Sequence, residues 1–233
     1  MADGQPKGPT INQVLDEFLA EQEKRLAPRT YRQYENVIDL LRYCLEDYVV
    51  LTDKKLEKAV DKARDAGAED AVCSLCPPRE IAGCISEFLG WFMVRKVVAG
   101  QDLMRAAGTV TRRLGRWLYE HEYIDIDDAE YFEEEGTQRG RALPKAKGLA
   151  DRLAAWVENQ PAVGSENTHE SHFRIEAVTK RGWMVKDVMG HLEGDVFVPS
   201  ELRNPQQVGW EVSGIIAETP RGLRWVEVWN VYP

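Results

Sequence analysis

The residues with the clearest chemical spacing are two cysteines, in the segment Cys73-Ser-Leu-Cys76. Two thiolates separated by two residues form half of a tetrahedral zinc site, and Cys84 and Cys44 are the other thiols available to complete it. A second interpretation treats the cysteines as small apolar core residues, because Cys44 and Cys84 each lie on the apolar stripe of a predicted helix. No second CxxC pair is present. We therefore prefer the core interpretation to a disulfide or redox role, and commit no metal ligands; Cys73, Cys76 and Cys84 stay weak candidates for a structural zinc ion.

Basic side chains are concentrated just before a strongly acidic run. Arg105, Arg112, Arg113 and Arg116 precede the segment from Glu120 to Glu135, which is rich in carboxylates. The net charge of -9 and the pI near 5.1 argue against a surface that attracts nucleic acid everywhere. Any nucleic-acid contact must therefore rest on a local patch. The acidic run fits a solvated linker, the commonest case, or a mimic of phosphate that shields the arginines.

The sequence contains no recognisable catalytic motif. It lacks a glycine-rich phosphate loop, a nucleophile elbow, an HExxH segment and a paired-carboxylate signature. His169 and His172 lie in a polar segment, and His191 lies in a predicted loop, so we interpret all three as surface residues. We expect the protein not to be an enzyme.

Residues 10 to 124 show the apolar period of amphipathic helices and predict four or five of them. Thr10 and Gln13 fit a capping box at the start of the first helix, and Pro28 suits the first turn of the second. A third helix is predicted from Thr52 to Ala66. Thr109 is the expected cap of the last helix. Residues 1 to 9 are polar, with glycine and proline, and are expected to be mobile.

The remaining residues divide into a linker and a β domain. Residues 125–164 combine carboxylates, glycines and Pro144 without a clear period, so we predict a linker with one short helix over 149–159. In residues 165–233, apolar and polar residues alternate with period two, and this pattern predicts five short strands. The expected fold class is α+β: an all-α bundle followed by a small five-stranded antiparallel β-barrel-like domain, because closure hides strand edges.

Four tryptophans lie in this predicted β domain: Trp183, Trp210, Trp225 and Trp229. Small barrels use such rings as stacking platforms for single-stranded nucleic acid, or they use them to fill a small core. We prefer the core interpretation.

Two segments carry a resemblance to a known family. The string TINQVLDEFLAEQEKRLAPRTYRQYENVIDLLRYCL contains Leu26, Pro28, Thr30 and Tyr34 in a Leu-x-Pro-x-Thr-x-x-x-Tyr arrangement. It resembles the start of the core-binding, SAM-like domain of phage integrases and other tyrosine recombinases. The string AGTVTRRLGRWLYEHEYI, Ala107 to Ile124, is similar to the last helix of that domain.

This resemblance implies a helical domain that grips duplex DNA mainly through phosphate contacts. The resemblance implies that residues of the second and last helices contact DNA: Arg29, Thr30, Arg32, Gln33, Arg112, Arg113 and Arg116. The sequence departs from the family at Ala27, which replaces a serine-like cap, and in the long insertion from Asp53 to Pro78. The catalytic set is missing too, since no histidine is followed by arginine three residues later. We therefore expect no strand transfer.

The sequence thus predicts a non-catalytic DNA-binding or recombination-accessory protein whose partner is duplex DNA. The alternative is a protein-protein interaction module that keeps the integrase-like fold without DNA affinity. A protein partner of the β domain is a further expectation. The polar N-terminal segment has no apolar signal stretch, and no apolar run is long enough to span a membrane, so we expect a cytoplasmic location.

Overall fold

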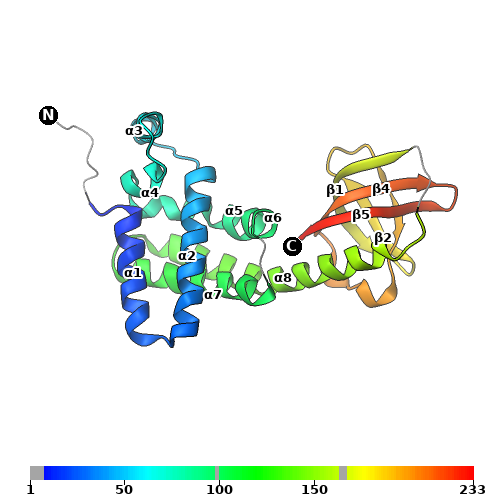
Figure 1. Ribbon diagram of the computed structural model, residues 1–233, viewed down its shortest axis with the longest axis horizontal. Coiled ribbons are helices and arrows are strands. Elements are labelled where there is room, and N and C mark those ends of the chain that lie inside the picture. The colour runs from blue at the N-terminus through cyan, green and yellow to red at the C-terminus, as the bar shows by residue number, and fades with distance from the viewer. Residues whose placement is uncertain (1–7, 98–99, 163–166) are drawn as a thin grey trace. The chain divides into compact units, whose positions relative to one another are not determined.

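The computed structural model describes residues 8–97, 100–162 and 167–233, and the chain divides into two compact units (Figure 1). The helical unit comprises Met1–Met93 with Val97–Arg141, and the β unit comprises Val94–Lys96 with Ala142–Pro233. The expected organisation, a helical N-terminal part followed by a five-stranded sheet, is confirmed. Most of residues 1 to 9, and residues 163 to 166 of the predicted linker and β domain, lie outside the described residues.

The first two helices of the helical unit form a hairpin. Helix α1 (Ile11–Arg25) begins at Thr10, whose side chain accepts from Gln13 N while the Gln13 side chain accepts from Thr10 N. Helix α2 (Pro28–Tyr48) has proline at its first position. The predicted capping box and the predicted start at Pro28 are confirmed. Phe18 packs against Tyr34 and against Trp117, which joins this hairpin to α7.

The region after α2 is divided into more helical segments than predicted. Seven α-helical segments occur before Ile124 among the described residues, where four or five were expected, because the insertion after α2 and the residues up to Arg95 fold into short pieces. These pieces and their bounds are α3 (Lys54–Asp65), α4 (Ala71–Leu75), the 3-10 helix η1 (Pro78–Cys84), α5 (Ile85–Glu87), the π-helix η2 (Phe88–Phe92) and α6 (Met93–Arg95).

Helix α7 (Gln101–Glu120) begins eight residues before Thr109, the expected cap. Thr109 is instead inside the helix, where its hydroxyl donates to Arg105 O.

The prediction of a linker with one short helix is wrong, because Ile126–Glu158 form one continuous helix, α8. Its glycines are packing residues and do not break it: a Cβ added to Gly108 of α7 would lie 2.3 Å from the Gly140 Cα. Close backbone contact between two helices requires such small residues. Because glycine has no apolar side chain, the sequence of this segment lacks the regular apolar spacing by which a helix is recognised.

The β unit contains β1 (Thr168–Val178), β2 (Gly182–Asp187), β3 (Glu193–Phe197), β4 (Glu211–Thr219) and β5 (Gly222–Tyr232). Short 3-10 helices η3 (Ser200–Leu202) and η4 (Pro205–Gln207) join β3 to β4. Strand β1 pairs with β4 through its first half and with β2 through its second half, so the pairing closes in the order β1-β2-β3-β5-β4. The expectation of a wholly antiparallel sheet is wrong at one pair, since β3 and β5 are parallel.

The core of the β unit lies inside this closed sheet and under the second part of α8. Trp183 and Trp225 are almost fully buried and pack with Phe173, Ile216 and their neighbours. Leu149 and Leu153 of α8 belong to the same cluster. For these two tryptophans the core interpretation is confirmed, whereas Trp229 remains 36% exposed. Every helix in the described part of the chain is too short or too polar to cross a lipid bilayer.

Candidate nucleic-acid interfaces

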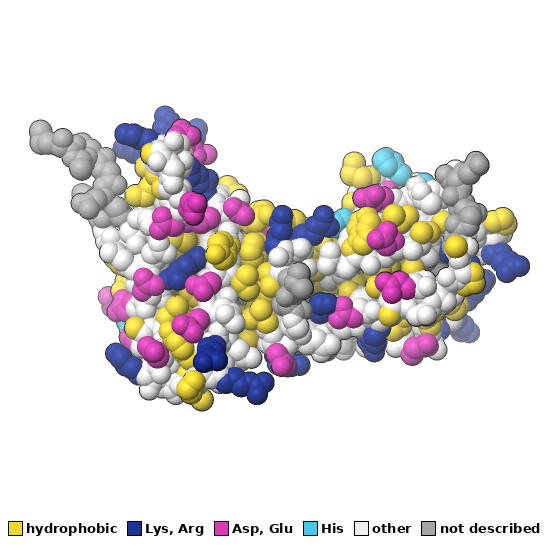
Figure 2. All heavy atoms as spheres, viewed as in Figure 1, with side chains coloured by type: hydrophobic (Ala, Val, Ile, Leu, Met, Phe, Trp, Pro, Cys, Tyr) yellow, Lys and Arg dark blue, Asp and Glu magenta, His cyan; other side chains and the backbone are white. Residues whose placement is uncertain are grey.

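The arginines predicted on α2 are exposed at the α1–α2 turn. Arg29, Thr30 and Arg32 are exposed, and Gln33 is half-buried. Lys24 and Arg25 at the end of α1 are exposed at the same turn. None of these four cations forms an ion pair with a residue that the structure describes. Figure 2 shows Lys and Arg side chains around this end of the helical hairpin, with Asp and Glu side chains among them.

Two of the arginines predicted on α7 pair with a single glutamate of the acidic run. Arg112 and Arg116 lie 3.5 and 3.6 Å from the two carboxylate oxygens of Glu133 on α8. Arg105 pairs with Asp102, and Arg113 is half-buried. Arg105 and Arg112 line a hollow of about 200 Å³ between α7 and α8, together with Thr109, Gly136, Thr137, Gly140 and Arg141. One residue of the acidic segment, Glu133, therefore pairs with both Arg112 and Arg116.

The four cysteines are free and lie buried in the core of the helical unit. Cys44 and Cys84 are buried with their sulfur atoms 3.4 Å apart, and the hydrogen bond to Cys84, with burial, raises the pKa of Cys44. Burial and then Glu46 raise the pKa of Cys73, and burial raises the pKa of Cys76 to about 12. Among the described residues, the one cluster of three metal-ligating side chains contains no cysteine. The burial of all four thiols supports the core interpretation of the cysteines.

Two matching turns of the β unit present cations that the sequence analysis missed. Thr179-Lys180-Arg181-Gly182 joins β1 to β2, and Thr219-Pro220-Arg221-Gly222 joins β4 to β5. In each Thr-x-Arg-Gly turn, the threonine hydroxyl accepts from the arginine N–H, at 3.3 and 3.2 Å, and donates to the glycine carbonyl. Arg203 also donates to Thr179 O at 2.7 Å. Both turns are thus fixed by hydrogen bonds and carry an exposed arginine.

Strand pairing brings these turns to the same end of β3. Phe197, the last residue of β3, pairs with Gly182 of the first turn, and Val196 pairs with Leu223, which directly follows the second turn. Lys180, Arg181 and Arg221 are exposed and Arg224 is half-buried. No ion pair joins any of the four to a carboxylate in the described residues. Figure 2 shows Lys and Arg side chains at the end of the β unit where β4 turns into β5.

An aromatic pair lies beside these cations. Phe197 is 50% exposed, and its ring centre lies 5.8 Å from that of Trp156, a half-buried residue of α8 within the same unit. Asp195, exposed two residues earlier on the same strand, is the nearest acidic side chain along β3. The patch formed by the two turns, Arg224, Phe197 and Trp156, which we call the turn-end patch, therefore combines positive charge with exposed aromatic surface.

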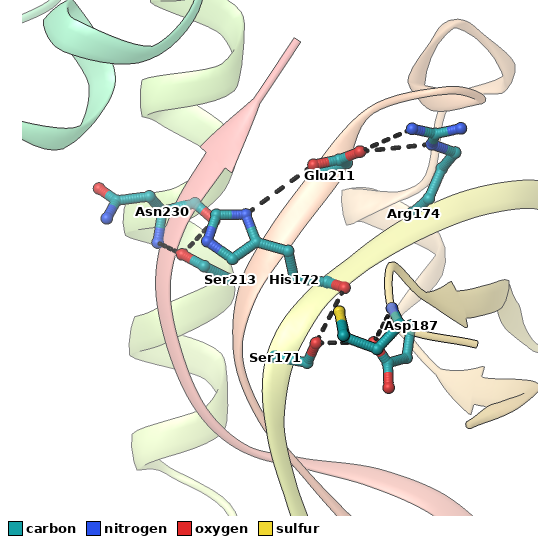
Figure 3. Close-up of polar contacts among 8 residues, drawn as sticks. Ser171, His172, Arg174, Asp187, Glu211, Ser213 and Asn230 are labelled. Atoms are coloured by element: carbon teal, nitrogen blue, oxygen red, sulfur yellow. Dashed lines mark hydrogen bonds and ion pairs between the residues drawn. The ribbon is translucent and has the colours of Figure 1, made fainter. Parts of the chain in front are cut away.

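A polar network on β1, β4 and β5 contains serine, histidine and carboxylate groups (Figure 3). The Ser213 hydroxyl is buried and bonds to the backbone of Asn230, accepting from its N–H at 3.1 Å. The Nδ1 of His172 lies 3.8 Å from Glu211, which accepts from Arg174 at 2.9 Å. These contacts join neighbouring strands, so the arrangement is a structural network of the sheet.

Asp187, at the end of β2, stabilises the turn between β2 and β3 through hydrogen bonds (Figure 3). It accepts from Met189 N at 2.7 Å and from the Ser171 hydroxyl at 2.8 Å. Burial alone would raise the pKa of Asp187, but these hydrogen bonds and His191 lower it overall. A carboxyl whose pKa falls on folding stabilises the fold above its unfolded pKa of about 3.9, and that stabilisation is lost as the pH falls toward the folded pKa.

We predict that Asp187→Asn lowers the free energy of unfolding of the β unit by about 1–2 kcal/mol at pH 7, because hydrogen bonds to a charged acceptor are lost. The deficit should shrink below about pH 4, where the wild-type carboxyl becomes protonated. Urea unfolding followed by tryptophan fluorescence at both pH values measures it. An equal deficit at pH 7 and pH 3 would rule out a role for the charge.

Comparisons of the chain with protein-family models, with curated proteins and with solved structures give no match. The integrase resemblance is carried by the residues quoted above and stays a prediction.

Proposed function

We propose that the chain is a non-catalytic nucleic-acid-binding protein whose turn-end patch holds a single-stranded segment. One observation carries this proposal: Arg181 and Arg221, both without ion pairs to described residues, lie on matching turns that flank the end of β3, where Phe197 is exposed. Proteins that bind single strands combine a positive groove that follows the backbone with aromatic rings on which bases stack. The turn-end patch has both components.

The closure of the sheet supports the same assignment. We propose that it acts as a small barrel, and small five-stranded barrels bind oligonucleotides on the face of strands two and three and on the loops after strands one and four. Those loops are the two Thr-x-Arg-Gly turns here. Hydrogen bonds that fix the turns before binding reduce the conformational entropy lost on binding.

A duplex contact by the helical unit remains a second part of the proposal. It is favoured by the cations at the α1–α2 turn, Arg29 and Arg32 among them, which have no carboxylate partner among the described residues. Arg112 and Arg116 support it less, because Glu133 occupies the position that a phosphate would take. A recombination-accessory role rests on the integrase resemblance alone.

The alternative function is a protein-protein interaction module without affinity for nucleic acid. The pairing of Arg112 and Arg116 with Glu133, together with the net charge of -9, favours it. For either function we propose a cytoplasmic location, which suits four free, buried cysteines. The two functions differ in one property, since only a nucleic-acid binder has an affinity that decreases with salt.

The proposal is tested by Phe197→Ala in a titration of the purified protein into a fluorescein-labelled single-stranded oligonucleotide, followed by anisotropy. Loss of one stacked base is expected to raise the Kd by about 5- to 150-fold, since base–aromatic stacking contributes about 1–3 kcal/mol. Met189→Ala is the matched control, because Met189 is 72% exposed on the β2–β3 turn, away from Phe197 along both strands. Equal affinities of wild type and Phe197→Ala would contradict the stacking role.

A further inference from the structure

Three side chains at the junction of α1 and the end of α7 have the composition of a transition-metal site. Glu17 and Glu21 lie one turn apart on α1, and His121 is the C-cap residue of α7. One ligand atom from each lies within 4.8 Å of the other two. The Nε2 of His121 is already 3.4 Å from Glu21 Oε1, close to the separation of about 3.3 Å between ligands of a tetrahedral zinc ion with bonds of about 2 Å.

Each of these side chains is oriented by a hydrogen bond through an atom that is not needed for a metal. The Nδ1 of His121 lies 2.8 Å from the Trp117 carbonyl, to which it donates, so the neutral ring keeps its lone pair on Nε2. Trp117 Nε1 donates to Glu21 Oε2 at 2.8 Å, and the Tyr123 hydroxyl donates to Glu17 Oε2 at 3.0 Å. Outer contacts of this kind fix the tautomer and the orientation of metal ligands.

The imidazole is also held in place by stacking. Its ring centre lies 4.1 Å from that of the buried Trp117, with 28° between the ring planes. His121 is half-buried, whereas Glu17 and Glu21 reach solvent. The arrangement is therefore a histidine fixed by stacking and a hydrogen bond, with two carboxylates that each accept one hydrogen bond and keep the other oxygen for an ion.

We propose that Glu17, Glu21 and His121 bind a zinc ion or a similar divalent transition metal, with water in the fourth position. One imidazole nitrogen and two carboxylate oxygens match the nitrogen and oxygen ligands that zinc accepts. The bound ion ties the first helix of the unit to the end of α7. This site does not depend on the proposed nucleic-acid function, because neither Phe197 nor the Thr-x-Arg-Gly turns contribute to it.

Zinc chloride titrated into untagged, EDTA-treated full-length protein, followed by calorimetry, tests the proposal. The expected result is one zinc ion per chain, with binding weakened more than about 10-fold in both His121→Gln and Glu17→Gln. Tyr123→Phe keeps all three ligands and loses one outer contact, so it should weaken binding by about 10-fold. His169→Gln is the matched control, since His169 bonds to the single carboxylate of Glu218 at 2.7 Å, and its binding should equal that of wild type.

A second measurement keeps the test independent of how the variants fold. At the same zinc concentration, the unfolding temperature of wild type should rise by more than that of Glu17→Gln, because stabilisation by mass action depends on affinity. Glu17 is an exposed residue that can be replaced without disturbing the core. Absence of binding by wild type overturns the proposal. So does binding that is unchanged in both Glu17→Gln and His121→Gln, or that is lost in His169→Gln.

Discussion

Reversing the charge of both turn arginines, as Arg181→Glu with Arg221→Glu, is expected to weaken binding of a single-stranded oligonucleotide more than about 100-fold at low salt. Each substitution removes a cation that has no ion pair to a described residue and places a carboxylate beside a phosphate. The fold should be preserved, because threonine hydroxyls and backbone N–H groups hold the turns, and the guanidinium groups of Arg181 and Arg221 do not. Anisotropy titration with the labelled oligonucleotide measures the loss.

Arg112→Glu with Arg116→Glu is the matched control for this experiment. It makes the same change of charge on the helical unit, at side chains that Glu133 already neutralises. We expect it to change the affinity for a single strand less than about 5-fold, since compensated cations release few counterions. The reverse pattern, with binding lost in the α7 variant and kept in the turn variant, would assign the contact to the helical unit.

The second large effect is expected from Gly108→Ala. A Cβ at this position would lie 2.3 Å from the Gly140 Cα and 2.5 Å from the Gly136 carbonyl oxygen, so α7 and α8 would have to separate. Overpacking of this kind costs about 1–3 kcal/mol and occasionally more, whereas alanine gains at most about 1 kcal/mol over glycine in helix propensity. Because both clashing groups are backbone, we expect the free energy of unfolding to fall by about 2 kcal/mol or more.

Urea unfolding followed by far-ultraviolet circular dichroism measures this change, because most of the helix content lies in the helical unit. Gly83→Ala is the control, since an added Cβ at Gly83 meets nothing within 4 Å. An unfolding curve of Gly108→Ala that coincides with that of wild type would contradict the close backbone contact between α7 and α8.

Local signals in the sequence predicted the local features of the fold. The capping box at Thr10, the helix start at Pro28 and the five strands depend on neighbouring residues, and each was predicted correctly. Helix α8 was missed because Gly136 and Gly140, which usually end helices, here contact another helix. The parallel pairing of β3 with β5 was missed because it depends on closure of the whole sheet.

For the candidate site too, the sequence predicted local features but not contacts between distant segments. The sequence placed Arg112 and Arg116 in a basic cluster, but their neutralisation by Glu133 requires α7 and α8 to pack together. The repeated Thr-x-Arg-Gly pattern was visible in the sequence and marks both turns. Their convergence on Phe197 was not visible, because it follows from the registers of β2, β3 and β5.

The salt dependence of single-strand binding tests the central claim most directly. Four cations of the turn-end patch, Lys180, Arg181, Arg221 and Arg224, are available to neutralise phosphates. The logarithm of the association constant should then fall with the logarithm of the salt concentration with a slope of about -3, since each contact on a single strand contributes about -0.7. A slope near zero, or no binding at low salt, would contradict the account and favour the protein-interaction alternative.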